Sequence, residues 1–304
     1  MLQARIAALA NEAGLTRIGF AAADITHGRA AFVRGGELFP LQSVSKFPVS
    51  VALLHMAQTR RLQLERPVTL TRDDIAPGAS SLADNLRRAP LRTTAHRLLE
   101  AMLVNSDNTA ADALMKISGG PAAIQRTLKD LQVDGIRVDR IERDLQVEAL
   151  GLAPPINFAK PDALARALDE LDVLEQRKAL DRYLRDPRDT ANARGLVKLL
   201  VRLTDGRLIQ PRFAAMLIDW MKRAKTGGDR LRSGFPQGWI VAHRSGTSAT
   251  VVGTTAAFND VALATGPKGQ RIALALLISA ATLKAAELAL FHKAVARAVY
   301  ETWS

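Results

Sequence analysis

Segments with the pattern of β-strands lie near the two ends of this chain, and a long helix-patterned stretch separates them. Strands from distant parts of a chain bury their apolar faces when they pair in one sheet that helices cover. We therefore expect an α/β (α+β) fold with one antiparallel sheet built from residues 1–41 and 229–304, and an all-helical lobe formed by residues 42–228. The expected strands cover residues 19–23, 30–33, 239–243, 254–265 and 272–278, with helices at about 2–13 and 283–302.

The composition excludes several classes of function. The 304 residues include no cysteine, which rules out disulfides, thiol catalysis and cysteine-bound zinc. The five histidines are far apart in the sequence, so we expect no metal site and no other cofactor. The net charge of +12 is scattered, with few aromatic residues beside it, so we expect no nucleic-acid partner. The longest apolar run, residues 272–283, is too short to span a membrane.

A serine and a lysine one helical turn apart begin a mostly apolar stretch at residues 43–58. Ser43 would lie at the positive end of this helix, and Lys46 would lie on the same face. A lysine in that place can take the hydroxyl proton if burial lowers the pKa of its amine. Pro48 fits only the first turn of such a helix. Taken alone, this common pattern more often marks a helix N-cap followed by a solvated lysine.

Two further polar clusters interrupt the apolar pattern. Residues 105–109 separate two helical stretches, where Ser106 or Asp107 could cap the second helix, or Ser106 could relay a proton and Asn108 could contact a substrate amide. Residues 244–247, Arg-Ser-Gly-Thr, follow the strand expected at 239–243. They could form a bend that ends the strand, or they could hold a carboxylate and a developing oxyanion.

Together these motifs resemble those of serine penicillin-recognising enzymes: Ser-x-x-Lys at 43–46, Ser-Asp-Asn at 106–108, and a basic residue followed by Ser-Gly at 244–246. Residues 140–146 resemble the Ω-loop segment that carries the glutamate of class A β-lactamases. The motifs occur in order and at fitting distances. The chain therefore resembles a class A β-lactamase over nearly its whole length, which implies a five-stranded antiparallel sheet flanked by the N- and C-terminal helices.

The resemblance implies a role for each motif residue. Ser43 would attack the β-lactam carbonyl, and the oxyanion would lie between the backbone N–H groups of Ser43 and Thr247. Lys46, or Glu142 acting through water, would be the acylation base, and Ser106 would pass a proton to the lactam nitrogen. Glu142 would activate the water that hydrolyses the acyl-enzyme. The implied substrate contacts are Asn108, Gln146, Arg244, Ser245, Gly246, Thr247 and, as a second carboxylate contact, Arg230.

Some positions depart from the family pattern. Arg244 replaces the usual lysine, so it keeps the charge but donates in a fixed fork. Gln146 replaces the more usual asparagine and adds one methylene. Gly253 stands where many members carry an arginine, and Arg230 stands where other members place a substitute.

The largest departure is an elongated Ω loop, at about 140–189. Arg140 and Asp189 would close its neck with a salt bridge, although Asp189 follows Glu142 by 47 residues (189 − 142). The extra stretch, residues 151–187, predicts helices at 161–171 and 174–184. We expect this extension either to gate the mouth of the site or to be a surface ornament without effect on turnover.

The sequence also fits other functions. The same scaffold could be a D-Ala-D-Ala peptidase or esterase, or a penicillin-acylated sensor without turnover. Glu142 argues against the peptidase or esterase, because such enzymes need no deacylating carboxylate there. The elongated Ω loop is the only feature that supports the sensor. We expect β-lactam small molecules as ligands, a monomer, and a periplasmic or secreted protein whose signal peptide has been removed before Met1.

Overall fold

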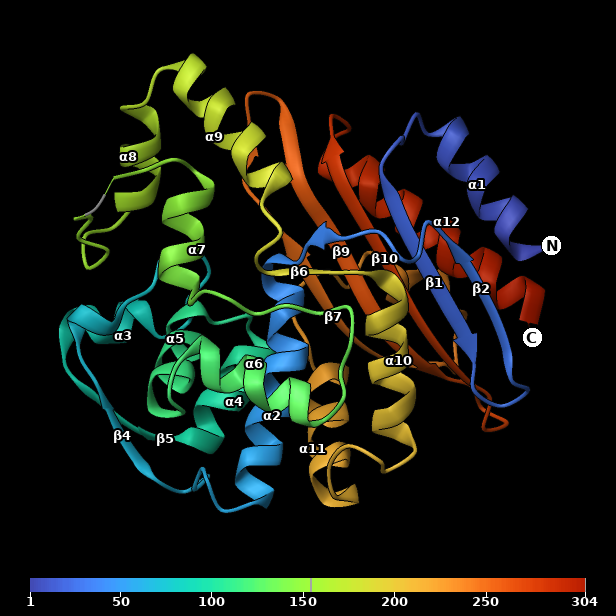
Figure 1. Ribbon diagram of the computed structural model, residues 1–304, viewed down its shortest axis with the longest axis horizontal. Helices are drawn as coiled ribbons and strands as arrows, with labels where there is room; N and C mark the ends of the chain where they lie inside the picture. The colour runs from blue at the N-terminus through green and yellow to red at the C-terminus, as the bar shows by residue number, and fades with distance from the viewer. Residues whose placement is uncertain (154, 304) are drawn as a thin grey trace.

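The computed structural model describes residues 1–153 and 155–303. It places a sheet with its covering helices beside a helical lobe (Figure 1). The main sheet has the strand order β2-β1-β10-β9-β7, with β8 paired to β9, and every pairing is antiparallel. Its strands are β1 (Ile18–Asp24), β2 (Arg29–Val33), β7 (Ile240–Thr247), β8 (Thr250–Val251), β9 (Thr254–Thr265) and β10 (Arg271–Ala281). The predicted fold class is confirmed, and β8 is a short addition.

Alternating side chains give the sheet two different faces. In β10, Ile272, Leu274 and Leu276 belong to the core that includes α1 (Leu2–Glu12) and α12 (Ala285–Trp303). The intervening alanines, Ala273 and Ala275, belong to the other core, on the side of the helical lobe. Successive residues of a strand point to opposite faces, so one strand supplies both cores. Small residues on the inner face let α10 (Ala193–Thr204) pack directly on β1 and β10.

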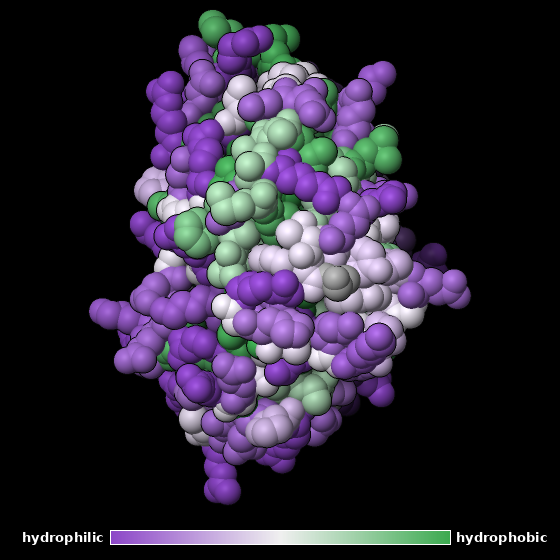
Figure 2. All heavy atoms as spheres, turned by 90° about the vertical axis from the view of Figure 1, so that its right-hand side faces the viewer, coloured by the Kyte–Doolittle hydropathy of each residue, from purple (hydrophilic) through white to green (hydrophobic). Residues whose placement is uncertain are grey.

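The outer layer, which carries α1 and α12, is turned toward solvent. Figure 2 shows that polar side chains cover much of this face and surround a strip of apolar ones in its upper half. Phe32 of β2 and Leu290 of α12 are among the exposed large apolar side chains of these elements. No described helix is both long and apolar enough to cross a bilayer.

The helical lobe surrounds α2, which is buried along most of its length. Burial on all sides over most of its length explains why this helix is largely apolar all round rather than amphipathic. The helices of the lobe are α2 (Lys46–Gln58), α3 (Ala83–Arg88), α4 (Ala95–Val104), α5 (Asn108–Ile117), α6 (Pro121–Asp130), α7 (Glu142–Ala149), α8 (Ala163–Asp169), α9 (Val173–Arg185), α10 and α11 (Pro211–Lys222). Single-turn 3₁₀ helices are η1 (Gln42–Ser45), η2 (Arg72–Asp74) and η3 (Leu231–Gly234).

The expectation of an all-helical stretch between residues 42 and 228 is wrong in one respect. β4 (Pro67–Leu70) pairs with β5 (Leu91–Thr94), and β6 (Thr190–Ala191) pairs with β3 (Phe39–Pro40) ahead of the lobe. Strands this short show too little alternation to be recognised from the sequence.

Two expected boundaries also differ. Ser43 lies in η1, and the α-helix begins only at Lys46, with Pro48 in its first turn as expected. The strand expected to end at residue 243 continues as β7 through Thr247, so the bend at 244–247 is wrong. Backbone pairing with β9 decides this, because Arg244 lies opposite Val261 and Gly246 opposite Asn259.

The elongated segment contains both predicted helices, α8 and α9. α9 spans nearly the predicted residues. α8 is shorter than predicted, because Asp162 has a left-handed φ of 58° and precedes the helix rather than lying in its first turn.

Candidate active site

The Ser43 hydroxyl and the Lys46 amine are in direct contact. Lys46 Nζ lies 2.9 Å from Ser43 Oγ and also donates to the backbone carbonyl of Ser106 at 3.1 Å and to Asn108 Oδ1. The lysine is fully buried. Burial lowers the pKa of Lys46, Glu142 partly opposes this shift, and the charge of Arg244 lowers the pKa further. An amine in this setting is a better proton acceptor than a solvated lysine.

Glu142, the first residue of α7, points toward the same amine. Its Oε1 lies 2.9 Å from Lys46 Nζ, and both side chains are almost completely buried. Its Oε2 accepts a hydrogen bond from Gln146 Nε2 at 3.2 Å, one helical turn along α7. Lys46 therefore contacts the serine hydroxyl and the glutamate carboxylate at the same time.

Asp112 of α5 holds the backbone of Glu142 in place, a role that the sequence patterns did not indicate. Asp112 accepts the backbone N–H groups of Glu142 at 2.6 Å and Arg143 at 3.0 Å, and so caps the start of α7. Burial raises the pKa of the Asp112 carboxyl to about 7, and the neighbouring charge of Glu142 adds to the shift. Only its position on α5, facing another helix start, could have indicated this role.

Ser106 brings a second hydroxyl to Ser43. Its backbone has a left-handed φ of 62°, and its Oγ donates to Ser43 Oγ at 3.1 Å. A left-handed backbone at a residue other than glycine costs energy, so the surroundings must hold it in place. Asp107 does this by capping α5 through Ala110 N at 2.8 Å. Of the two capping candidates, Asp107 is therefore the cap, and Ser106 faces the site.

Asn108 spans two segments of the site. Its Oδ1 accepts from Lys46, and its Nδ2 donates to the Pro77 carbonyl at 2.7 Å. The side chain is buried, so it also holds the 75–83 loop against α5.

Arg244 of β7 lies behind Ser106. Its guanidinium donates to Ser106 Oγ through Nη2 and to Thr226 Oγ1 through Nη1 at 3.1 Å. Thr226, which the sequence did not indicate, also bonds to Ser245 Oγ at 3.0 Å. Burial lowers the pKa of Arg244 to about 10, so the group remains charged at neutral pH.

Gly246 lets β7 approach the nucleophile turn closely. A Cβ atom at this position would lie 2.6 Å from the Leu41 carbonyl oxygen, 2.8 Å from Val44 N and 3.1 Å from Ser43 N. Asn259 ties the same turn to β9 by donating to the carbonyls of Pro40 at 2.8 Å and Leu41 at 3.2 Å. Any larger residue at 246 would push the sheet away from Ser43.

Arg230 reaches the end of β7 from behind. Its Nη2 donates to Thr247 Oγ1 at 2.5 Å, its Nη1 donates to the Asn259 carbonyl at 2.9 Å, and its guanidinium stacks on Phe258. The arginine is buried, whereas Thr247 is exposed. The charge of Arg230 therefore reaches the site surface through the Thr247 hydroxyl.

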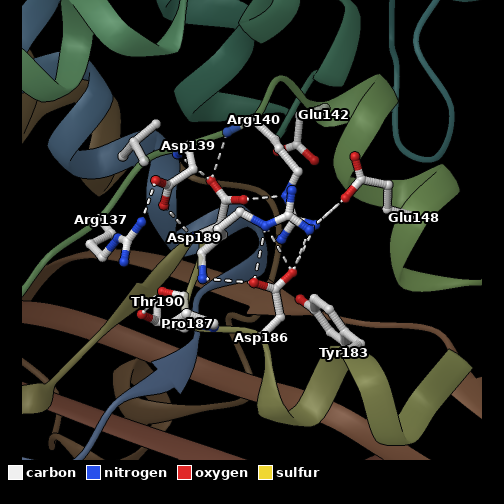
Figure 3. A network of polar contacts seen from close by, with 12 residues as sticks. Arg137, Asp139, Arg140, Glu142, Glu148, Tyr183, Asp186, Pro187, Asp189 and Thr190 are labelled. Carbon is white, nitrogen blue, oxygen red and sulfur yellow. Dashed lines mark hydrogen bonds and ion pairs between the residues drawn. The ribbon is translucent and has the colours of Figure 1, made fainter.

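A network with a buried centre at Arg140 and Asp189 joins the two ends of the elongated loop (Figure 3). Arg140 Nε donates to Asp189 Oδ2 at 2.6 Å, and Arg140 Nη1 lies 2.8 Å from Glu148 and 3.1 Å from Asp186. Asp189 also accepts the backbone N–H groups of Asp139 and Arg140. Arg188 pairs with both Glu148 and Asp186. The structure thus brings Arg140 and Asp189 together despite the long insertion between them.

Comparison with known proteins shows the family to which the chain belongs. The sequence model of the β-lactamase enzyme family matches residues 1–303. A β-lactamase of Streptomyces albus G is 31% identical over 247 residues, which are 80% of this chain and 67% of that protein. The chain belongs to the β-lactamase enzyme family. A β-lactamase of Citrobacter koseri is 28% identical and matches 86% of this chain and 74% of its own length.

Solved structures extend the likeness to the whole fold. An ancestral class A β-lactamase superposes with a TM-score of 0.80 at 28% identity and covers 100% of both chains. The TLA-3 extended-spectrum β-lactamase has a TM-score of 0.80 at 20% identity, with 99% of this chain and 98% of that one covered, and shows the fold alone. The predicted resemblance to class A β-lactamases and the enzymatic nature of the chain are confirmed.

In this β-lactamase-family chain the elongated loop forms one wall of a cavity of about 420 Å³. The opposite wall is the loop that Asn108 holds, including Pro77 and Gly78, and Ala249 beyond β7 also lines the cavity. The extension contributes apolar side chains, among them Phe158, Leu164 and Leu168. The predicted extension therefore packs against the 75–83 loop, and both carry the walls of one cleft.

Proposed function

We propose that this protein hydrolyses β-lactam antibiotics through an acyl-serine intermediate and a water molecule activated by Glu142. The observation that carries the proposal is the position of Lys46 Nζ, 2.9 Å from both Ser43 Oγ and Glu142 Oε1. The amine of Lys46, the base proposed for acylation, thus contacts both the proposed nucleophile and the carboxylate proposed for deacylation.

In the proposed acylation, the Ser43 hydroxyl attacks the lactam carbonyl, and its proton passes to the uncharged amine of Lys46, which lies 2.9 Å from it. The lowered pKa of Lys46 supports this assignment over Glu142 acting through water. The backbone N–H groups of Ser43 and Thr247 would hold the oxyanion, and such donors typically contribute about 100- to 1,000-fold in rate. Ser106, held between Ser43 and Arg244, would give the proton to the lactam nitrogen.

In the proposed deacylation, Glu142 takes a proton from water while Gln146 holds that water. The buried carboxylate keeps its place through Lys46 on one oxygen and Gln146 on the other. The peptidase, esterase and sensor alternatives need no carboxylate in this place, and no contact of the site favours them.

For substrate binding we propose that the exposed Thr247 hydroxyl and Ser245 hold the substrate carboxylate. Arg230 and Arg244 are both buried and would act through Thr247 and through Ser106, respectively. Asn108 would contact the amide of the substrate side chain beside the cavity of about 420 Å³.

The direct test is hydrolysis of a chromogenic cephalosporin such as nitrocefin by the wild type and Ser43→Ala. We expect Ser43→Ala to lose at least about 1,000-fold in kcat/KM, because the nucleophile is gone. Ser118→Ala removes a hydroxyl that only closes the end of α5 on the Met115 carbonyl, and should stay within about twofold. Absence of hydrolysis by the wild type, or equal rates for Ser43→Ala, would show the proposal to be wrong.

We further propose that the extension shapes substrate choice rather than being an ornament. Phe158→Ala and Leu164→Ala enlarge the cavity and should change the ratio of kcat/KM for bulky over small lactams at least about fivefold. Leu174→Ala, in the same extension but 60% exposed, is the matched control. Equal ratios in all three variants would support the ornament.

Because the drugs that attack the cell wall act outside the cytoplasm, we propose that the protein works in the periplasm or outside the cell, as a monomer. Fractionation of the native host with an antibody against the chain tests the first point. Light scattering on the purified protein tests the second.

A further inference from the structure

A hydrogen-bond chain connects the extension to the carboxylate of Glu142. Tyr183 of α9 accepts a hydrogen bond from Gln42 Nε2 at 2.7 Å, and Gln42 Oε1 accepts from Gln146 Nε2 at 3.0 Å. Gln146 Nε2 also donates to Glu142 Oε2 at 3.2 Å. The chain starts in the elongated segment, passes beside the nucleophile and ends on the proposed base.

The first two members of this chain, Tyr183 and Gln42, are well shielded from water. Tyr183 is 5% exposed and Gln42 is 3% exposed. Tyr183 lies next to Asp186 and close to Arg140, at the end of α9 that the loop neck holds in place (Figure 3). Burial raises the pKa of the Tyr183 hydroxyl, so it stays protonated and neutral at neutral pH. Hydrogen bonds in such dry surroundings are costly to break.

The direction of the chain follows from the carboxylate at its end. An ionised Glu142 only accepts hydrogen bonds, so the NH₂ end of Gln146 must face it. The second hydrogen of that NH₂ group then faces Gln42 Oε1, and Gln42 turns its own NH₂ toward Tyr183. Gln146 consequently presents its carbonyl oxygen, which accepts no hydrogen bond from the described residues, as a free acceptor.

This orientation matters for a nucleophilic water. A water that donates both its hydrogens, one to Glu142 and one to Gln146 Oε1, directs a lone pair at the acyl carbon. If the Gln146 amide rotated, its NH₂ group would compete for that lone pair. Holding the amide in one orientation therefore favours attack.

We propose that Tyr183 and Gln42 are positioning residues for deacylation, through which the inserted helix α9 sets the orientation of Gln146. This inference rests on the proposed function. Neither residue touches the substrate: Tyr183 acts through Gln42, and Gln42 acts through Gln146. The elongated loop is then part of the catalytic arrangement rather than a cover over it.

The test is Tyr183→Phe, which removes the hydroxyl and keeps the ring. Intact-protein mass spectrometry after mixing with benzylpenicillin gives the rate constants of acylation and deacylation separately. We expect deacylation to slow about five- to tenfold, with acylation changed less than twofold, so kcat and KM fall together. Tyr300→Phe, at the only other tyrosine of the sequence, should leave both rate constants unchanged. Unchanged deacylation in Tyr183→Phe, or an equal loss in both steps, would overturn the proposal.

A double-mutant cycle separates positioning from loosening of α9. Gln42→Met breaks the same chain, so Tyr183→Phe/Gln42→Met should deacylate within about twofold of Gln42→Met alone. If the double variant slowed deacylation by the product of the two single-variant factors, the proposal would be overturned. If the wild type formed no acyl-enzyme, the proposed function would fail. If the wild type turned over and Tyr183→Phe matched it, only the positioning role would fail.

Discussion

Arg140 and Glu142 are two residues apart, yet their buried side chains lie in opposite surroundings. Arg140 has three carboxylates around it, those of Asp189, Asp186 and Glu148. Glu142 instead faces two basic side chains, Lys46 by direct contact and Arg244 through the field of its charge. One residue, Ile141, separates a cluster rich in negative charge from one rich in positive charge.

The opposite surroundings of Arg140 and Glu142 shift the pKa values of the two clusters in different directions. Burial alone would lower the pKa of Arg140, but its hydrogen bonds to Asp189 and Glu148 and the charge of Asp189 raise it, so this arginine is held in its charged form. Burial raises the pKa of Asp189, and its hydrogen bonds with Arg140 oppose that shift. In the cluster around Glu142, burial lowers the pKa of Lys46 and the charge of the neighbouring Arg244 lowers it further. The ion pairs of Arg140 in the neck therefore keep their charges, whereas the lowered pKa of Lys46 lets this amine lose a proton. We call the cluster of Lys46, Glu142 and Arg244 the centre.

Among variants that keep every charged and reacting group, the largest effect should come from a shift of β7 relative to Ser43. Gly246→Ala places a methyl group against Leu41 O and Val44 N, so β7 must shift away from Ser43. We expect kcat/KM to fall at least about 100-fold, as for displacements of about 1 Å in other sites. Gly228→Ala, where the added atom meets nothing within 4 Å, is the control and should keep wild-type kcat/KM. A Gly246→Ala enzyme with wild-type rates would mean that this contact does not position the nucleophile.

Breaking the neck should affect stability more than chemistry. Arg140→Met leaves Asp189 buried without its cation, which typically costs about 3–5 kcal/mol in the free energy of unfolding. Arg137→Met removes an ion pair to Asp139 that is 46% exposed on the arginine side, and should cost less than about 1 kcal/mol. Urea unfolding of both variants measures the difference. Equal losses would contradict a special role for the buried neck.

The raised pKa of Asp112, which lies beside Glu142, should make the free energy of unfolding depend on pH. Below about pH 4 its carboxyl is protonated in both the folded and the unfolded chain. Between about pH 4 and the folded pKa of about 7, only the unfolded chain loses the proton, so the wild type loses stability as the pH rises. Relative to the wild type, Asp112→Asn should therefore gain roughly 2–4 kcal/mol between pH 4 and pH 7. Unfolding curves across this range would refute the assignment if the difference stayed constant.

The smallest effect should come from Arg244→Lys, which keeps the charge of the centre. A lysine can reach Ser106 but cannot contact Thr226 at the same time through a fork. We expect kcat/KM to fall about three- to tenfold. A loss above about 100-fold would show that the fork, rather than the charge, is what the centre needs.

The same comparison shows what could be read from the sequence. Ser43, Lys46 and Glu142 lie in local patterns, and the alternation of β9 and β10 survives in long strands, so the sheet and the central residues could be predicted. The end of β7 could not be predicted, because Arg244 and Gly246 belong to the strand through their pairing with β9 and not through local propensity.

Contacts between distant segments leave no local pattern. Gln42 and Tyr183 are hydrogen-bonded although 141 positions separate them in the sequence, and Thr226 and Arg244 are 18 positions apart. Asp112 looks like an ordinary helix residue until the start of α7 packs on it. These side chains support the motif residues, and only the fold brings them together.

The most direct measurement is the fate of the acyl group in Glu142→Gln. The isosteric amide keeps the shape of the site but cannot take a proton from water. Mixed with benzylpenicillin and followed by intact-protein mass spectrometry, the variant should carry one penicilloyl group on Ser43 that persists at least about 1,000 times longer than in the wild type. Release of the group at the wild-type rate, or no adduct on Ser43 in either protein, would contradict the account.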